Sequence, residues 1–249
     1  MNKTNAKNLQ LTLTCTVSFC CLFVGVLLAK PIEFDNRFQT VLDRYDIEYQ
    51  IPREGKAILV NIPSYEMIAL ERGRPVLRSR IILGTPWHPT PLLETYTPIV
   101  RFRPSWRPPP SMVASGEYLD RIWPPSESNP LGLAAVHLRD GRSGYLHDTN
   151  CPELFQRPDR APSHGCIRVQ DWGDLVAFVL DTPLEQVHRL ANGRQTMDIE
   201  TPSIPFSVRY LRNFMDITGQ LVSSRDIYRR DPFSNAWEQP VKVTCDAAE

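Results

Sequence analysis

The chain has 249 residues, of which 42% are hydrophobic, so it can bury one substantial core but not two ordinary domains. Its 28 basic and 28 acidic residues cancel, which leaves no overall electric field to recruit nucleic acid, and we predict no nucleic-acid partner. Proline outnumbers glycine, 23 to 12, which favours a β-rich fold with many rigid connections.

Residues 1–30 predict a membrane anchor or signal segment. Lys3 and Lys7 precede an apolar stretch from Leu9 to Ala29, and positive charge ahead of such a stretch keeps the N-terminus inside the cell. The stretch is long enough to span a bilayer and its cleavage pattern is poor, so a retained inner-membrane anchor and a cleaved signal both stay open. Either one predicts that the body is periplasmic or otherwise extracytoplasmic.

The next segment, 31–54, has apolar residues at helical spacing and predicts an amphipathic helical spacer that packs on the core. The body, 55–231, opens with strand patterns. Apolar or alternating runs at 57–60, 67–69, 76–83 and 95–102 are separated by turn residues, as in a β-meander.

A proline-rich segment, 104–130, follows these strands and holds seven prolines together with Trp106 and Trp123. Proline-locked backbone cannot enter a sheet interior, so the segment is predicted to lie over the surface as a stiff flap, with a short helix at 115–122. It is either a lid over a functional site or an ordinary structural loop with buried tryptophans.

The remaining elements alternate between strand and helix. Residues 134–138 and 143–147 predict a hairpin that turns at Asp140 and Gly141. Two helices are expected, at 171–180 with an acidic cap and after Pro183 as far as Asn192. Strand patterns at 198–229 and a loose polar tail at 232–249 complete the chain. The sequence therefore predicts a mainly β fold with a few helices.

Chemistry concentrates in the run Ser163-His164-Gly165-Cys166-Ile167-Arg168, which follows His147 by fewer than 20 residues. A cysteine attacks carbonyl groups as the thiolate, so a catalytic one needs a nearby imidazole to take its proton. His147 fits that role, and Gly165 lets the backbone amides around Cys166 turn toward a developing oxyanion. The alternative is a buried structural cysteine beside two hydrogen-bonded histidines.

The spacing of His147 and Cys166 within Ser-His-Gly-Cys resembles the signature of the L,D-transpeptidase catalytic domain, the YkuD family. That signature ends in Ser/Thr-x-Gly-Cys, then Ile, Val or Leu, then Arg or Asn. The likeness covers about 55–231, and the runs 144–169, 204–210 and 226–228 resemble the YcbB-type subgroup more narrowly. The resemblance implies a β-sandwich of the L,D-transpeptidase catalytic-domain type, with 104–130 as a lid.

The resemblance also implies the reaction and its partners. Cys166 would attack the third residue of a peptidoglycan tetrapeptide stem, usually meso-diaminopimelate, and release D-alanine, while His147 serves as base. A stem amine as acceptor gives 3-3 crosslinks; a free D-amino acid gives exchange, water gives L,D-carboxypeptidase trimming, and a lipoprotein lysine gives protein anchoring. The thiol would be a carbapenem target, and no cofactor is implied. A non-catalytic wall-binding scaffold is the alternative of another class.

Several neighbouring residues are secondary candidates. His164 faces the same side as Cys166 in an extended chain, so it is either the base or, as the resemblance implies, a wall or oxyanion neighbour. Arg168 suits a substrate carboxylate or a surface salt bridge. Tyr145, Arg160 and Trp106 are weaker candidates for substrate binding.

The other thiols and histidines raise two further questions. His147, Cys151, His164 and Cys166 form a conceivable zinc set, but their spacings do not match the usual fingers or ribbons, and we predict no metal. With Cys166 reserved as nucleophile, Cys151 and Cys245 are left to form a disulfide in an exported chain, or to stay as separate thiols.

Overall fold

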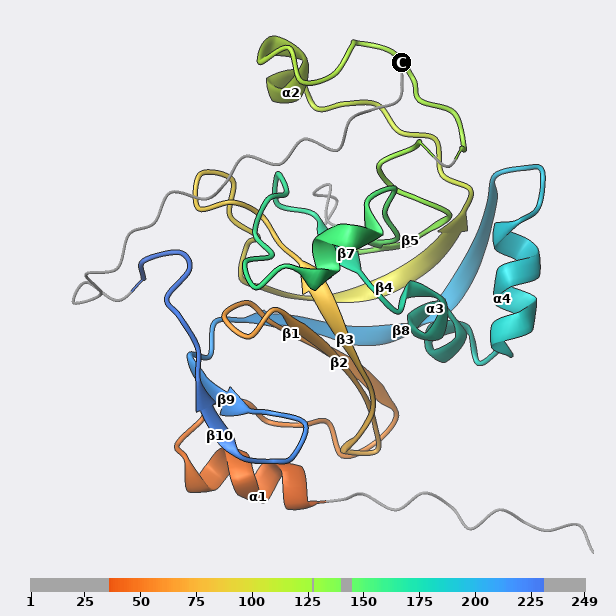
Figure 1. Cartoon of the computed structure of the whole chain (residues 1–249). Helices are drawn as coiled ribbons and strands as arrows, with labels where there is room; N and C mark the ends of the chain where they lie inside the picture. The colour runs from red at the N-terminus through yellow and green to blue at the C-terminus, as the bar shows by residue number, and fades with distance from the viewer. Residues whose placement is uncertain (1–35, 127, 140–144, 231–249) are drawn as a thin grey trace, which may run out of the picture. The chain divides into compact units, whose positions relative to one another are not determined.

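The computed structural model describes residues 36–126, 128–139 and 145–230, which all belong to one compact unit (Figure 1). The predicted anchor or signal at 1–30, the turn at Asp140 and Gly141 and the tail at 232–249 lie outside the described residues. Within the described part, no helix is both long enough and apolar enough to cross a membrane.

Strands dominate the described elements. They are β1 (Lys56–Asn61), β2 (Glu66–Glu71), β3 (Arg74–Ile82), β4 (Leu93–Phe102), β5 (Ala134–His137), β6 (Tyr145–His147), β7 (Ile167–Val169), β8 (Met197–Arg209), β9 (Asn213–Met215) and β10 (Leu221–Ser223). The helices are α1 (Asn36–Arg44), α2 (Pro110–Ala114), α3 (Trp172–Leu180), α4 (Leu184–Ala191) and a 3-10 turn, η1 (Pro152–Gln156). The predicted mainly β fold with a few helices is confirmed.

Eight strands pair in the order β1-β2-β3-β7-β6-β5-β4-β8, and β8 also pairs with β1, so the sheet closes on itself. The sandwich implied by the resemblance therefore takes the form of one continuous ring of strands. The β6–β7 and β1–β8 pairs are parallel, while the other neighbours run antiparallel. The short strand β7 lies between β6, the strand before it in the chain, and β3, which is far from it in sequence.

The ring encloses the main core. Ile58, Val60, Met67 and Ala69 alternate along β1 and β2 and point into this core, which α3 and α4 complete with residues such as Val179. Burying a large aliphatic or aromatic side chain stabilises a fold by about 1.5–3 kcal/mol. The many buried side chains of the main core together stabilise the ring of strands, from whose ends the loops extend.

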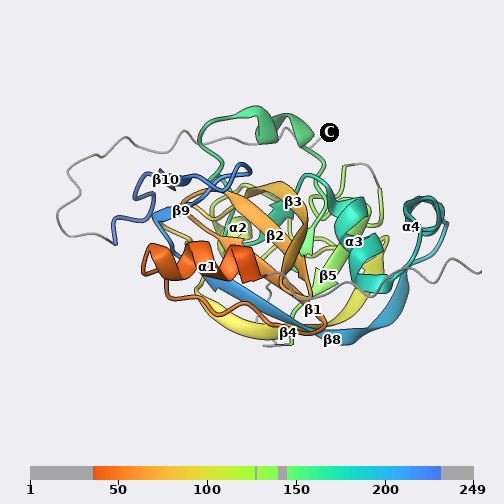
Figure 2. The ribbon, with the colours of Figure 1, turned by 90° about the horizontal axis from the view of Figure 1, so that it is seen from below.

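A second core lies outside β1 and β2, under α1. Phe38 and Leu42 of α1 are buried against Leu59 and Ile68, the side chains that β1 and β2 turn away from the ring. Phe38 also meets Phe214 edge to face, with ring centroids 6.2 Å apart, and Figure 2 shows α1 alongside β9 and β10. Because both faces of β1 and β2 are covered, their sequences are continuously apolar.

Two helix predictions differ from the structure. The helical spacer predicted over 31–54 is helical only at Asn36–Arg44 within the described residues; Ile47, Tyr49 and Ile51 then alternate as buried residues of an extended segment. The short helix predicted at 115–122 is wrong, because the helix of the flap is α2, at Pro110–Ala114. Proline is favoured in a first helical turn, and Gly116, with φ of +73°, cannot continue the helix.

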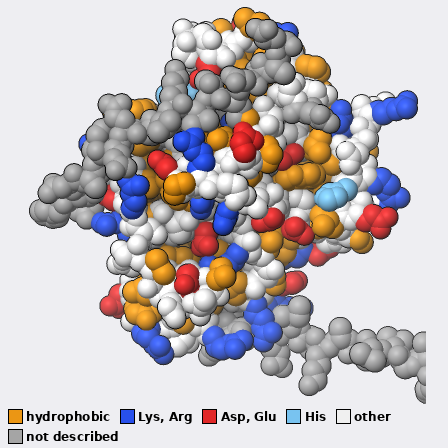
Figure 3. All heavy atoms as spheres, in the orientation of Figure 1, with side chains coloured by type: hydrophobic (Ala, Val, Ile, Leu, Met, Phe, Trp, Pro, Cys, Tyr) orange, Lys and Arg blue, Asp and Glu red, His pale blue; other side chains and the backbone are white. Residues whose placement is uncertain are grey.

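The other elements lie close to their predicted positions. β5 and β6 pair antiparallel as the predicted hairpin requires. Asp171 stands at the N-cap of α3, although its side chain makes no capping hydrogen bond. On the face drawn in Figure 3, basic and acidic side chains are interspersed, and no large area carries a single sign of charge.

Candidate active site

Parallel pairing of β6 with β7 brings the predicted nucleophile, base and arginine together. Leu146 lies opposite Ile167, and His147 opposite Arg168. Leu146 and Ile167 both point into the main core, so the next residue of each strand points out of the ring. Cys166, two residues before Arg168, lies on that same outer side, and its thiol acts electrostatically on the Arg168 guanidinium. Residues distant in sequence thus share one small patch.

His147 is held as a neutral imidazole. Its side chain is 3% exposed, and its Nδ1 lies 2.5 Å from the main-chain oxygen of Asp148. A carbonyl oxygen can only accept, so Nδ1 carries the proton and Nε2 is left as an acceptor. Burial, assisted by the positive charge of Arg168, lowers the pKa of His147 to about 3, although the Asp148 carbonyl opposes the shift. At ordinary pH this ring is therefore neutral, with its Nε2 lone pair available as an acceptor.

The loop that carries Cys166 is clamped by hydroxyl groups. Ser163 Oγ donates to the main-chain oxygen of Cys166 at 2.7 Å and accepts from the Gly165 amide at 3.2 Å. From the other side, Thr90 Oγ1 donates to the Gly165 oxygen at 3.1 Å. Gly165 has φ of +105°, a conformation that favours glycine. The Gly165 amide is therefore committed to Ser163, and an oxyanion would need other donors.

Gly84 allows this loop to approach the end of β3. A Cβ atom at Gly84 would lie 2.0 Å from the His88 oxygen and 2.9 Å from the Gly165 amide nitrogen. Tyr228 secures the contact, because its hydroxyl donates to the Gly84 oxygen at 2.8 Å and accepts from the Thr90 amide at 3.1 Å. Sequence reasoning assigned no role to Gly84 or Thr90, and noted Tyr228 only within the resemblance.

The flap reaches the same patch through Glu117 and Tyr118. Glu117 Oε2 lies 3.4 Å from His164 Nε2, and both side chains are mostly buried, with 19% and 23% of their surfaces exposed. Tyr118 packs edge to face between Trp106 and Trp123, with centroid distances of 4.8 Å and 5.8 Å. This arrangement gives Trp106 a packing role within the flap, and the lid interpretation of 104–130 stays a prediction.

Arg168 is largely buried at the floor of this patch. Burial lowers the pKa of its guanidinium, and Tyr118, the Cys166 thiol and two nearby carboxylates oppose that shift. Among the described residues, its Nε has no hydrogen-bond partner. The buried position disfavours the surface salt-bridge alternative, and a buried donor without a partner is costly unless a ligand satisfies it.

The weaker candidates are distributed differently. Arg160 donates to three main-chain oxygens, those of Ile81 at 3.3 Å, Arg157 at 3.1 Å and Tyr65 at 3.3 Å, so its guanidinium braces a loop against β3. Tyr145 belongs to β6, but its side chain lies outside the description. Substrate binding by Arg160, Tyr145 and Trp106 stays a prediction.

The thiols and histidines near the site are also placed. Cys151 is disulfide-bonded, and Cys245, its predicted partner, lies outside the described residues. Cys166 is in no disulfide and is partly exposed. The ring of His88 lies against that of His164, tilted by 32°, with centroids 4.6 Å apart. In the described part of the chain no three His, Cys, Asp or Glu side chains gather as a metal site would require.

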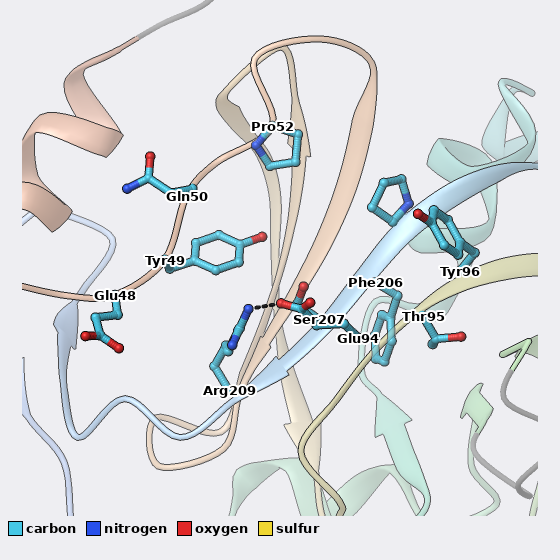
Figure 4. A pocket seen from close by; sticks show the side chains of 11 residues that line it. Glu48, Tyr49, Gln50, Pro52, Glu94, Thr95, Tyr96, Phe206, Ser207 and Arg209 are labelled. Carbon is cyan, nitrogen blue, oxygen red and sulfur yellow. Dashed lines mark hydrogen bonds and ion pairs between the residues drawn. The ribbon is translucent and has the colours of Figure 1, made fainter.

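A separate groove of about 750 Å³ lies on the outer face of β4 and β8 (Figure 4). The extended segment at 48–52 forms one wall, and Tyr96 lies on the opposite side. An ion pair between Glu94 and Arg209 crosses its floor. None of the residues predicted for the active site lines this groove.

The comparison with protein families agrees with this arrangement. Residues 55–196, more than half of the chain, match the family of the L,D-transpeptidase catalytic domain, YkuD. A thiol and an imidazole on a β scaffold are the parts that an acyl-transfer enzyme needs. The chain belongs to the L,D-transpeptidase catalytic domain family. The narrower likeness to the YcbB-type subgroup stays a prediction.

Individual relatives are more distant. A Haemophilus influenzae protein provisionally named an L,D-transpeptidase is 26% identical over 224 residues, which cover 73% of this chain and 46% of that protein. The chain thus spans about half the length of this curated relative. A mutant Enterococcus faecium L,D-transpeptidase is 16% identical with a TM-score of 0.37, over 63% of this chain and 50% of the other. An L,D-transpeptidase solved with imipenem is 15% identical with a TM-score of 0.40, over 63% and 59%.

Proposed function

We propose that this protein is a peptidoglycan L,D-transpeptidase that works through an acyl-enzyme on Cys166. The observation that carries the proposal is the β6–β7 register, which sets His147 beside Arg168 on the outer side of the ring where Cys166 lies. Acyl transfer from a carboxylate-bearing peptide requires a thiol, a neutral imidazole and a donor for the carboxylate. Cys166 is partly exposed, His147 is buried and neutral, and the Nε of Arg168 has no hydrogen-bond partner among the described residues.

The first half-reaction uses these groups in order. Arg168 binds a carboxylate of the tetrapeptide stem through its planar donor fork. His147 takes the thiol proton at Nε2, and the thiolate of Cys166 attacks the carbonyl carbon of the third residue. The carbon–nitrogen bond to the terminal D-alanine then breaks, and His147 returns the proton to the leaving amine. A thioester on Cys166 remains.

The second half-reaction sets the product. A stem amine that attacks the thioester forms a 3-3 crosslink, which is the outcome we favour; a free D-amino acid, water or a lipoprotein lysine would give the other products. The flap over the site reduces the access of water, which favours transfer to an amine over hydrolysis. We place the reaction outside the cytoplasm, where peptidoglycan lies, with 1–30 as the exporting or anchoring segment.

Intact-mass spectrometry of the full-length chain tests the proposal. Incubation with a defined tetrapeptide muropeptide should give one covalent adduct that lacks D-alanine, and incubation with a carbapenem should give one adduct per chain. Cys166→Ala should give neither adduct. A wild-type chain that forms no adduct with either reagent would instead support a wall-binding scaffold that keeps the fold.

A further inference from the structure

The flap places a carboxylate in the candidate active site that the mechanism above does not use. Glu117 lies 3.4 Å from His164, two residues before Cys166, and only 19% of its side chain is exposed. The Glu117 amide donates to the main-chain oxygen of Met112, in α2, at 3.0 Å, so the backbone of Glu117 is held in place. A carboxylate held mostly out of water needs a positive partner, and His164 provides one only when protonated.

Arg168 supplies an opposite charge in the same part of the site. Its guanidinium acts electrostatically on Glu117 and on Cys166, yet the ion-pair contact of Glu117 is with His164. The Nε of Arg168 has no hydrogen-bond partner in the described part of the chain. A negative and a positive side chain therefore lie close enough to Cys166 and to each other to interact electrostatically, and an ammonium and a carboxylate on one carbon atom would complement that pair.

We propose that Glu117 is an acceptor-binding residue: with Arg168 it receives the amino-acid head group of the incoming amine, Glu117 holding the ammonium and Arg168 the carboxylate. This inference rests on the proposed function and specifies its second half-reaction. It selects acceptors whose nucleophilic amine is next to a carboxylate, such as a D-amino acid or the distal end of a diaminopimelate side chain. Water and a simple alkylamine lack one or both of these contacts.

Transfer of the acyl group from Cys166 to the acceptor amine needs no residue beyond those already described. One proton leaves the bound ammonium to solvent, which gives the free amine. The amine nitrogen attacks the thioester carbon, the carbon–sulfur bond breaks, and an amide forms. His147 takes the second nitrogen proton and passes it to the departing sulfur of Cys166, which restores the thiol. Glu117 makes no bond in this step and acts by binding and orienting the acceptor.

The test separates acylation from acceptor use. The full-length chain is acylated with a tetrapeptide muropeptide, D-methionine is added, and the exchanged tetrapeptide and the hydrolysed tripeptide are quantified by mass spectrometry. Loss of one charge-assisted hydrogen bond predicts that Glu117→Gln lowers the ratio of exchange to hydrolysis by about tenfold and raises the KM for D-methionine to match. The rate of acylation is measured separately for each variant, so that the ratio of exchange to hydrolysis reports acceptor use alone.

Three controls sharpen the result. Asp120→Asn removes another flap carboxylate, which pairs with Arg107, and should leave the ratio unchanged. Glu117→Asp keeps the charge and should recover part of the ratio. With the wild-type chain, D-methioninamide, which keeps the amine but not the carboxylate, should be a poorer acceptor than D-methionine, and this comparison needs no variant.

The possible failures are distinguishable. A Glu117→Gln chain that acylates normally and keeps the wild-type ratio would overturn this inference alone. A variant that loses acylation and exchange equally would show that Glu117 only supports the flap, and would overturn it as well. A wild-type chain that forms no acyl-enzyme would overturn the proposed function together with the inference.

Discussion

Buried His147 should make the stability of this protein sensitive to mild acid. In an unfolded chain an imidazole titrates near its ordinary pKa of 6.5, whereas in the folded protein burial and Arg168 lower the pKa of His147 to about 3. Between these two values the unfolded chain binds a proton that the folded chain does not. The stabilisation is therefore complete above pH 6.5 and is lost as the pH falls toward 3.

The size of the effect follows from the width of that interval. Each pH unit within it changes the free energy of unfolding by about 1.4 kcal/mol. Lowering the pH from about 7.5 to about 5 crosses roughly 1.5 units of the interval, so His147 alone should remove about 2 kcal/mol of stability. That loss is a large part of the free energy of unfolding of an ordinary domain, which is about 5–15 kcal/mol.

Urea unfolding of wild type and His147→Asn at both pH values measures this contribution. The variant loses stability at neutral pH through its altered packing, but that loss is common to both pH values. Its drop in stability between them should be smaller than the wild-type drop by about 2 kcal/mol. His188→Asn, which removes a histidine from an exposed position of α4, serves as the control. Equal drops in wild type and His147→Asn would refute the reasoning.

Three further predictions concern the support of the nucleophile. Gly84→Ala forces a Cβ atom to within 2.0 Å of the His88 oxygen, so it should lower the free energy of unfolding by about 1–3 kcal/mol. The variant should show a lower Tm, and slower acylation because the Cys166 loop must shift. A wild-type Tm would contradict the close approach. Tyr228→Phe removes the hydroxyl that bridges the Gly84 oxygen and the Thr90 amide, so it should lower the free energy of unfolding by about 1–3 kcal/mol. Hydrogen exchange of the Thr90 amide should become faster. Unchanged exchange would mean that the bridge is unimportant. Arg168→Lys keeps the charge but loses the donor fork, so turnover of tetrapeptide should fall about tenfold or more; unchanged kinetics would remove Arg168 from the substrate site.

Local patterns were enough to predict most strands and the chemical motif. The apolar runs of β1 and β2 indicated strands directly, and the spacing of His147 and Cys166 singled out the candidate thiol and base. Both signals depend on residues that are near in sequence. The predicted helical spacer failed beyond Arg44 because a short amphipathic pattern does not say where tertiary contacts turn a helix into an extended segment.

The assembly of the site was not predictable in the same way. That His147 and Arg168 share a face depends on the parallel register of β6 and β7, which a single sequence does not encode locally. Glu117 and Tyr118 stand far from Cys166 in the chain, and only the folding of the flap brings them near Arg168. Tyr228 reaches Gly84 from the other end of the body, and no local pattern marks that hydrogen bond.

The closed order of strands bears on how the chain acquires its fold. β1 is among the first strands to be synthesised, yet one of its two partners is β8, the last strand of the ring. Pairing of β1 with β8 joins strands that are far apart in sequence, and such pairing is slow. The ring around the main core cannot close before β8 has been synthesised. In a protein proposed to work outside the cytoplasm, the ring would therefore stay open, and the chain unfolded, while its N-terminal part crosses the membrane. The ring would close after translocation.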